Sequence, residues 1–162
     1  MTRFQIIIGR TEDIEFIDVE SKVPAKIDTG AYRSSIHCSK VKLLKKEDGT
    51  EVLRATLFGH PCAPEEKEIE FSTFSKVVVT NSFGKTEERY VVNMKIKLGP
   101  KVFSSSFTLA NRSNTLMPVL IGRKLLKNRF VVDVAKNSLH NRQELKKLFG
   151  GRLLVDEEDF EE

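Results

Sequence analysis

Short apolar runs recur along most of the chain, separated by turns that contain glycine, proline, asparagine or aspartate. Residues 89–98 alternate between apolar and polar side chains, which is the pattern of a strand with one buried face. Asp48-Gly49 predicts a tight hairpin turn, because this dipeptide tolerates the positive φ angles of a two-residue connection. The expected strands are 4–8, 14–19, 23–27, 34–45, 51–58, 69–74, 76–80, 89–98, 102–110, 117–122 and 130–134. This pattern predicts an all-β barrel or sandwich.

Two segments towards the C-terminus have a helical composition. Residues 123–128 predict one short helix directly after a buried strand, and residues 141–149 predict a second helix that ends at a pair of glycines. We therefore expect a β domain over residues 1–134 and a C-terminal extension, with a helix and an acidic tail, over residues 135–162.

The composition is that of a folded protein, with 40% hydrophobic and 31% charged residues in a chain of 162. No stretch approaches the ~20 apolar residues of a membrane span, and the first residues show no apparent secretory signal. Cys38 and Cys62 are too few for a disulfide framework, so a reducing compartment is the simpler interpretation. We expect a cytoplasmic protein without a membrane partner.

Charge is spread unevenly along the chain. Residues 156–162 hold six of the 23 acidic residues and no basic one, so the rest of the chain carries 27 basic against 17 acidic residues. Such a body attracts polyanions, whether nucleic acid, a membrane surface or acidic peptide. Binding of nucleic acid is the weaker interpretation, because no aromatic-basic motif accompanies the charge. The acidic tail is either a disordered, solubilising end or a segment that competes with an acidic ligand.

The most informative stretch is Asp28-Thr29-Gly30-Ala31, directly after the apolar run 23–27. It resembles the catalytic loop of aspartic proteases, in which the carboxylate activates a water molecule. Thr29 would hold the loop, and Gly30 would let the backbone approach the carboxylate. Alone, the tripeptide is also consistent with a solvent-facing turn, since Asp and Gly are ordinary turn formers.

A second motif, Pro118-Val119-Leu120-Ile121-Gly122-Arg123, makes the first one specific. Retroviral aspartic proteases pair their Asp-Thr-Gly loop with a later apolar strand that ends in Gly-Arg and leads into a short helix. Glycine is needed there because a side chain would strike the loop backbone. The sequence is similar to that arrangement in both motifs and in their order. The resemblance implies a closed retropepsin-like acid-protease barrel, with a flap hairpin between the motifs.

The sequence resembles still more closely a bacterial family of retropepsin-like proteins that carries the label of ATP-dependent zinc proteases. The segments that carry this resemblance are 23–31, 34–37 and 118–123. The family is associated with ATP-grasp ligases that add glutamates to protein C-termini, notably of a small-subunit ribosomal protein. The resemblance implies a peptidase that trims glutamate tails, with an acidic peptide or glutamate-tailed protein as its partner.

One position departs from the retroviral pattern. There an acidic residue follows the alanine and pairs with the arginine of the second motif, whereas Tyr32 and Arg33 stand here. Arg123 therefore finds a different partner or is free to meet substrate.

The candidate site residues follow from these motifs. The catalytic candidates are Asp28, Thr29 and Gly30. The substrate-binding candidates lie around the two motifs and are Lys26, Ala31, Arg33, Ser34, Ser35, His37, Arg112 and Arg123. Most single Lys and Arg residues simply face solvent. As a set around a catalytic loop they suit an acidic peptide, because arginine binds carboxylates in a bidentate manner.

Aspartic-protease chemistry needs two carboxylates that share one proton. The chain has one Asp-Thr-Gly loop and no internal repeat, so a second carboxylate would come from a second copy in a two-fold homodimer. The alternative is a monomer in which Asp28 works with His37, Lys26 or an arginine.

No cofactor is expected. Zinc is conceivable at His37-Cys38 or at His60 and Cys62, with His140 far along the chain, but the paired spacings of known zinc motifs are missing. No glycine-rich phosphate loop supports ATP use. The function expected is hydrolysis of peptide bonds in glutamate-rich tails, with Asp28 activating water. The alternative is a non-catalytic module that binds acidic peptides or a partner protein.

Overall fold

The computed structural model describes residues 5–80 and 83–137, which form eleven strands and one short α-helix. The expected helix at 141–149 and the acidic tail at 156–162 lie outside the described residues. The strands are β1 (Ile6–Ile8), β2 (Thr11–Phe16), β3 (Ser21–Ile27), β4 (Ser35–Lys45), β5 (Glu51–Leu57), β6 (Lys67–Phe71), β7 (Ser75–Thr80), β8 (Thr86–Leu98), β9 (Lys101–Ala110), β10 (Val119–Ile121) and β11 (Phe130–Val132). The helix α1 spans Arg123–Leu126.

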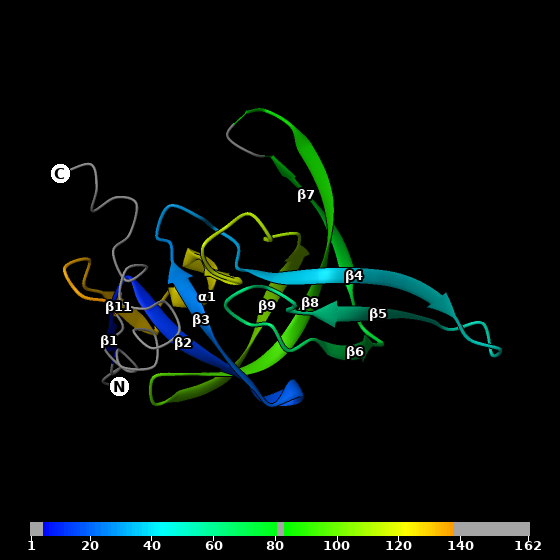
Figure 1. Ribbon diagram of the computed structural model, residues 1–162, viewed down its shortest axis with the longest axis horizontal. Helices are drawn as coiled ribbons and strands as arrows, with labels where there is room; N and C mark the ends of the chain where they lie inside the picture. The colour runs from blue at the N-terminus through cyan, green and yellow to red at the C-terminus, as the bar shows by residue number, and fades with distance from the viewer. Residues whose placement is uncertain (1–4, 81–82, 138–162) are drawn as a thin grey trace.

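Six of these strands form a hydrogen-bonded ring in the order β10-β3-β2-β8-β9-β4 (Figure 1). The short strand β10 closes it, because β10 pairs in parallel with β3 and antiparallel with β4. The structure thus confirms a mostly-β fold with one short helix after the second motif. In place of the expected closed barrel it has this ring, which β10 joins to β4 through only the register pairs at Val119 and Leu120.

The strand expected over residues 14–19 is wrong at its end. Residues Ile17–Val19 form a turn of 3-10 helix, which closes when the N–H of Glu20 donates to the carbonyl of Ile17 at 3.3 Å. Glu20 has a positive φ of 50°, a conformation that apolar alternation cannot reveal.

The core fills the interior of the ring and is built from the inward faces of its strands. Its largest side chains are three phenylalanines without solvent exposure: Phe16 on β2, Phe58 just after β5, and Phe107 on β9. The Phe16 ring lies 5.3 Å from that of Phe107 and 5.7 Å from that of Phe58, within the range of favourable aromatic pairs. Buried aromatics from three elements fix the ring's cross-section and hold β2 in place.

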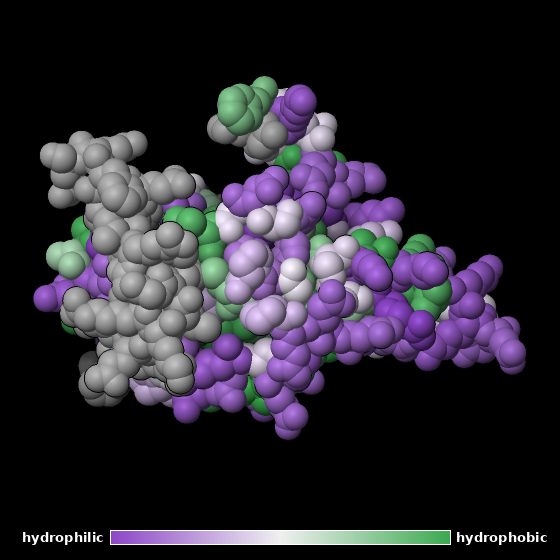
Figure 2. All heavy atoms as spheres, viewed as in Figure 1, coloured by the Kyte–Doolittle hydropathy of each residue, from purple (hydrophilic) through white to green (hydrophobic). Residues whose placement is uncertain are grey.

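Two hairpins extend beyond the ring. The strands β4 and β5, with β6 beside β5, form a long arm whose visible face is mostly hydrophilic (Figures 1 and 2). The first residues of β8 pair only with β7, and together they form a hairpin that projects from the body (Figure 1). This hairpin lies between the two motifs in sequence, where a flap was expected.

A separate two-stranded parallel sheet joins the beginning and the end of the described chain. Ile7 of β1 and Val131 of β11 are register partners, and their side chains are 55% and 45% exposed. An exposed apolar pair on one sheet face is a surface that another protein could cover. No helix in the described part of the chain is long and apolar enough to cross a membrane.

The backbone just after β10 passes very close to the loop that follows β3. A Cβ atom on Gly122 would lie 2.6 Å from the carbonyl oxygen of Arg33 and 2.7 Å from that of Tyr32. Both obstacles are backbone atoms, which cannot rotate away as a side chain could. The expectation that glycine is needed at this position is therefore confirmed.

We predict that Gly122→Ala lowers the free energy of unfolding by about 1–3 kcal/mol, the usual cost of forcing an extra methyl group into a packed site. Chemical denaturation followed by circular dichroism measures this loss. Gly49→Ala is the control, because Gly49 has open space around it and would suffer only from its positive φ of 88°. An unfolding midpoint of Gly122→Ala equal to that of the wild type would contradict the prediction.

Candidate functional site

Asp28 stands at the end of β3, where the backbone leaves the ring. Its N–H donates to the carbonyl of Ile121 at 2.8 Å, which continues the parallel pairing of β3 with β10. One carboxylate oxygen of Asp28 accepts the N–H of Gly30 at 2.9 Å, while Thr29 and Gly30 are exposed. The loop therefore presents a carboxylate that is held by backbone and still reachable from solvent.

Three further backbone N–H groups, at the end of the second motif and just after it, donate to the loop region. The N–H of Gly122 donates to the buried hydroxyl of Ser34 at 3.0 Å. The N–H groups of Arg123 and Lys124 donate to the carbonyls of Ala31 and Tyr32 at 2.8 and 2.9 Å. Ser34 and Ala31, which were expected to bind substrate, thus lie where the two motifs join.

Arg123 finds its partners in the loop itself. Its guanidinium donates to the carbonyl of Thr29 at 3.1 Å and lies 6.0 Å from the centre of the Tyr32 ring. The guanidinium of Arg33 lies 5.9 Å from the same ring. A cation–π contact with Tyr32 and a carbonyl bond therefore stand where the retroviral pattern has an ion pair.

Arg123 also belongs to a different surface from Asp28. It lines a pocket of about 660 Å³ that is bounded on one side by the loop and on the other by α1 and β11. The lining residues are Thr29, Tyr32, Arg123, Lys124, Leu126, Lys127, Phe130 and Val132. Lys26 lies instead with Asp28 around a cavity of about 70 Å³. The predicted basic residues are thus divided among separate places.

Arg112, in the segment after β9, lies within electrostatic reach of Asp28. Burial and the positive charge of Arg89 lower the pKa of Arg112 to about 10, while the carboxylate of Asp28 opposes this shift. The Nε–H of Arg112 donates to the carbonyl of Met117 at 3.2 Å. The guanidinium of Arg112 is therefore partly withdrawn from water and subject to repulsion from a second one.

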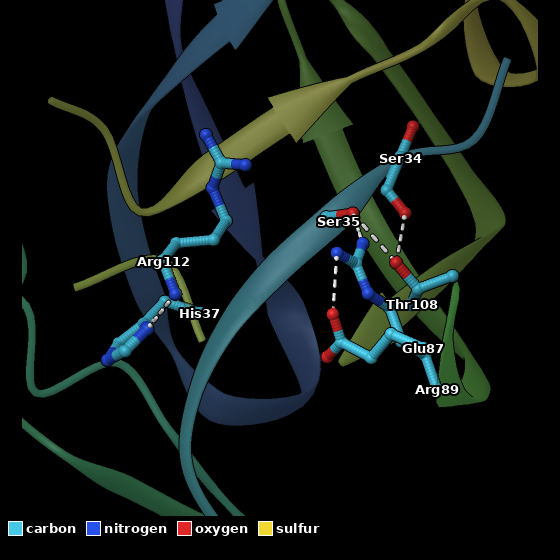
Figure 3. Close-up of polar contacts among 7 residues, drawn as sticks. All are labelled: Ser34, Ser35, His37, Glu87, Arg89, Thr108 and Arg112. Carbon is cyan, nitrogen blue, oxygen red and sulfur yellow. Dashed lines mark hydrogen bonds and ion pairs between the residues drawn. The ribbon is translucent and has the colours of Figure 1, made fainter. Parts of the chain in front are cut away.

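That second guanidinium, Arg89 on β8, was not predicted from the sequence. It donates to the buried hydroxyl of Ser35 at 3.5 Å, and Ser35 shares a 2.7 Å hydrogen bond with Thr108 (Figure 3). The hydroxyl of Thr108 donates in turn to the carbonyl of Ser34 at 3.3 Å. Ser35, expected to touch substrate, instead forms part of a buried chain of hydroxyls beneath Arg89. An alternating strand gave no sign of this, because Arg89 occupies an ordinary polar position.

His37 is buried beside His60 and is not open to solvent. The two rings are 5.6 Å apart, and Nδ1 of His37 accepts the N–H of Arg112 at 2.9 Å (Figure 3). Burial, above all, lowers the pKa of both His37 and His60. The pair is therefore neutral near pH 7, and His37 positions the backbone of Arg112.

The candidate zinc ligands do not fit a metal. Nδ1 of His60 accepts the N–H of Cys62 at 3.1 Å, and its Nε2 lies 2.9 Å from the carbonyl of Thr115, so both ring nitrogens are in use. The thiols of Cys38 and Cys62 bond to carbonyls at 3.0 and 3.2 Å, and burial raises the pKa of each. No three His, Cys, Asp or Glu groups within residues 5–80 and 83–137 are placed to hold a metal ion. His140 lies outside the described residues.

A solved structure is similar to this chain in both sequence and fold. A crystal structure of the protein Lpg0085 from Legionella pneumophila, described as of unknown function, is 31% identical and superposes with a TM-score of 0.68. The match covers 84% of this chain and 98% of that one. The two proteins therefore share their fold over most of this chain and nearly all of the Legionella protein.

Curated relatives at similar identity are named for ligation. Proteins named "Probable alpha-L-glutamate ligase" match at 29% identity in Desulfotalea psychrophila and at 31% in Shewanella halifaxensis. The matches cover 80% and 79% of this chain but only 28% and 29% of those proteins, so the chain spans less than a third of their length. A region like this chain is thus fused to glutamate-ligase proteins.

The family comparison confirms the resemblance and the type of enzyme expected from the two motifs. The sequence model described as "RimB-like: Retropepsin-like aspartic endopeptidase RimB" matches residues 7–143, well over half of the chain. That range includes the Asp28 loop, the Gly122 crossing, and both arginines near the carboxylate. The chain belongs to the RimB-like family of retropepsin-like aspartic endopeptidases.

Proposed function

We propose that this chain hydrolyses peptide bonds in the glutamate-rich C-terminal tails of proteins, with Asp28 as the base that activates water. The observation that carries the proposal is that the carboxylate of the Asp-Thr-Gly loop lies within electrostatic reach of Arg112, which also lies within reach of Arg89. These two positive charges favour an acidic peptide over a neutral one. An apolar substrate would leave these charges without partners.

The relatives support the same class of substrate. An enzyme named for glutamate ligation makes a product that contains added glutamate, and a peptidase region in the same chain would act on that product. We infer a functional association of this chain with an ATP-grasp glutamate ligase, and a glutamate-tailed protein as its substrate. The two free thiols of this chain, Cys38 and Cys62, support activity in the reducing cytoplasm.

The proposed reaction is the addition of water across a peptide bond. The carboxylate of Asp28 takes a proton from water while the water oxygen bonds to the carbonyl carbon. The tetrahedral intermediate then loses its C–N bond, and the leaving nitrogen takes the proton that Asp28 had accepted, which gives the amine product and restores the carboxylate. The backbone bonds to Asp28 hold its oxygen in place during both steps.

A second acidic group is needed to polarise the scissile carbonyl, and we propose that a second copy of the chain supplies it. The described chain has one Asp-Thr-Gly loop, and a two-fold dimer would bring Asp28 against its equivalent. The exposed apolar pair of Ile7 and Val131 supports such a dimer as surface for a second copy to cover.

We predict that Asp28→Asn lowers kcat on a peptide ending in a run of glutamates by about 100- to 10,000-fold, the usual contribution of a general base. Mass spectrometry of the products and steady-state rates measure the loss. Thr50→Ala is a distant control, since it alters only the turn around Asp48. Equal cleavage by the wild type and by Asp28→Asn would overturn the catalytic role. Tight binding without cleavage by either protein would favour the non-catalytic module.

The dimer predicts a dominant effect of the inactive variant. Mixing wild type with a ninefold excess of Asp28→Asn should convert most wild-type subunits into mixed dimers and reduce their rate at least fivefold. Thr50→Ala in the same excess controls for crowding and adsorption. A rate per wild-type subunit that does not change with added variant would show that one copy suffices.

Removal of metal should leave the reaction intact, because the histidines and thiols that could bind zinc are engaged by backbone groups. We expect the rate after treatment with 1,10-phenanthroline and dialysis to stay within about twofold of the untreated rate, well below the tenfold change that ~1.4 kcal/mol represents. A loss of activity that added zinc restores would contradict this prediction.

A further inference from the structure

Two arginines from different elements reach the same stretch of β4. Arg89 extends from β8 at the base of the projecting hairpin, and its guanidinium donates to the hydroxyl of Ser35 (Figure 3). Arg112 follows the end of β9, and its N–H donates to His37, two residues further along β4. The charges of Arg89 and Asp28 both act on Arg112, so the fold places both groups within electrostatic reach of its guanidinium.

Each guanidinium has used only part of its hydrogen-bonding capacity. Arg112 donates from Nε to Met117, and its terminal nitrogens make no hydrogen bond to any residue in the described part of the chain. The Nε of Arg89 is buried and has no partner among the same residues. The terminal nitrogens of Arg89 lie 3.5 Å from Ser35 and 3.4 Å from Glu87, at the long limit for hydrogen bonds. A buried donor such as the Nε of Arg89 is costly unless a ligand accepts from it, and the terminal nitrogens of Arg112 remain available to the same ligand.

The positive charges of Arg89 and Arg112 favour the binding of an anion. Burial and mutual repulsion weaken the charged form of Arg112, and the pKa shift of that group reports both effects. Glu87 offsets Arg89 only partly, because its side chain is 58% exposed and well hydrated. A carboxylate that accepted from both guanidiniums would relieve the repulsion and satisfy the free donors at once.

A chain of buried hydroxyl groups holds the orientation of Arg89. Ser35 can accept from Arg89 because its own proton is directed to Thr108, which passes its proton to the carbonyl of Ser34. Ser35 and Thr108 are buried, so the chain of hydroxyls does not depend on solvent. Arg112 is held similarly, by its backbone bond to His37 and its side-chain bond to Met117. Both guanidiniums are therefore fixed before a ligand arrives.

We propose that Arg89 and Arg112 together bind one carboxylate of the substrate beside Asp28, and that this pair determines the preference for acidic peptides. The proposal rests on the proposed function for the nature of the substrate. The carboxylate is either a glutamate side chain or the terminal carboxylate of the tail, and both present the same two oxygens. Glu87 then acts as a competitor that the substrate displaces from Arg89.

The first test uses substitutions that keep length and remove charge. Arg89→Met and Arg112→Met should each raise KM for a glutamate-tailed peptide by about 10- to 100-fold, the usual value of a hydrogen bond to a charged group. The change in kcat should be smaller. Glu87→Gln should do the opposite and lower KM, because it releases Arg89 from its internal partner. KM values unchanged in all three variants would overturn the proposal.

A matched control separates this pair from general charge. Arg54→Met removes one positive charge from β5, where Arg54 pairs with Glu68 and Glu70 at the surface. It should leave KM within about twofold, since exposed pairs of this kind contribute little. An equal rise of KM in Arg54→Met would show that net charge, rather than this pair, attracts the peptide. Arg112→Lys keeps the charge and reveals whether the bidentate geometry is needed.

The source of the carboxylate is identified by changing the peptide. Glutamates are replaced one at a time by glutamine, or the C-terminus is amidated. At one position the change should weaken peptide binding by the wild type and have little further effect on peptide binding by Arg89→Met. Weakening that is the same in both proteins at every position would overturn the assignment.

The outcome can also be read without catalysis. Fluorescence anisotropy of a labelled peptide on Asp28→Asn protein measures binding alone, so a failure of the proposed peptidase activity would still leave the carboxylate site testable. Binding that Arg89→Met and Arg112→Met weaken would support the site even if no cleavage occurred. Equal affinities of that protein for glutamate and glutamine peptides would reject it.

Discussion

The close passage of β10 behind the Asp28 loop is the constraint on which the rest of the structure depends. Because Gly122 has no side chain, its backbone can approach the carbonyls of Tyr32 and Arg33, and its N–H can reach the hydroxyl of Ser34. The same short strand pairs with β3 and β4 and so closes the ring. One contact therefore joins the fold and the site: if β10 moved outward, the ring would open and Asp28 would lose its bond to Ile121.

The loop is stabilised without the ion pair found in the retroviral pattern. Arg123 bonds to the carbonyl of Thr29 and lies near the ring of Tyr32, so the loop keeps its anchor without an acidic residue at position 32. An acidic residue at position 32 would have added negative charge near a site that faces arginines. The substitution thus leaves the positive charge around Asp28 undiminished, which suits an acidic substrate.

The same arginines impose a compromise on the site. Two guanidiniums with unused donors are unfavourable in the unoccupied protein, because burial weakens their hydration and their charges repel. Placing them on β8 and after β9, each held by bonds to neighbouring groups, keeps them from turning outward to water. A carboxylate that binds both guanidiniums offsets the free energy that they cost the protein. Functional sites commonly carry such locally unfavourable groups.

Periodicity and turn residues located the strands, because alternation and glycine-containing turns are local properties. The turn after Phe16 differed, and so did the bounds of several strands, such as β2, β6 and β10. The two motifs likewise identified Asp28, Gly122 and the family, since each needs particular residue types at particular places. Sequence did not reveal the contacts of Arg89, the burial of His37, or the place of Arg123 on a pocket with α1 and β11. These depend on which strands become neighbours, and the pairing of β10 with β3 and of β4 with β9 joins residues far apart in the chain. The residue types of the two motifs thus identified the loop, whereas only the tertiary structure decided which charges lie near its carboxylate.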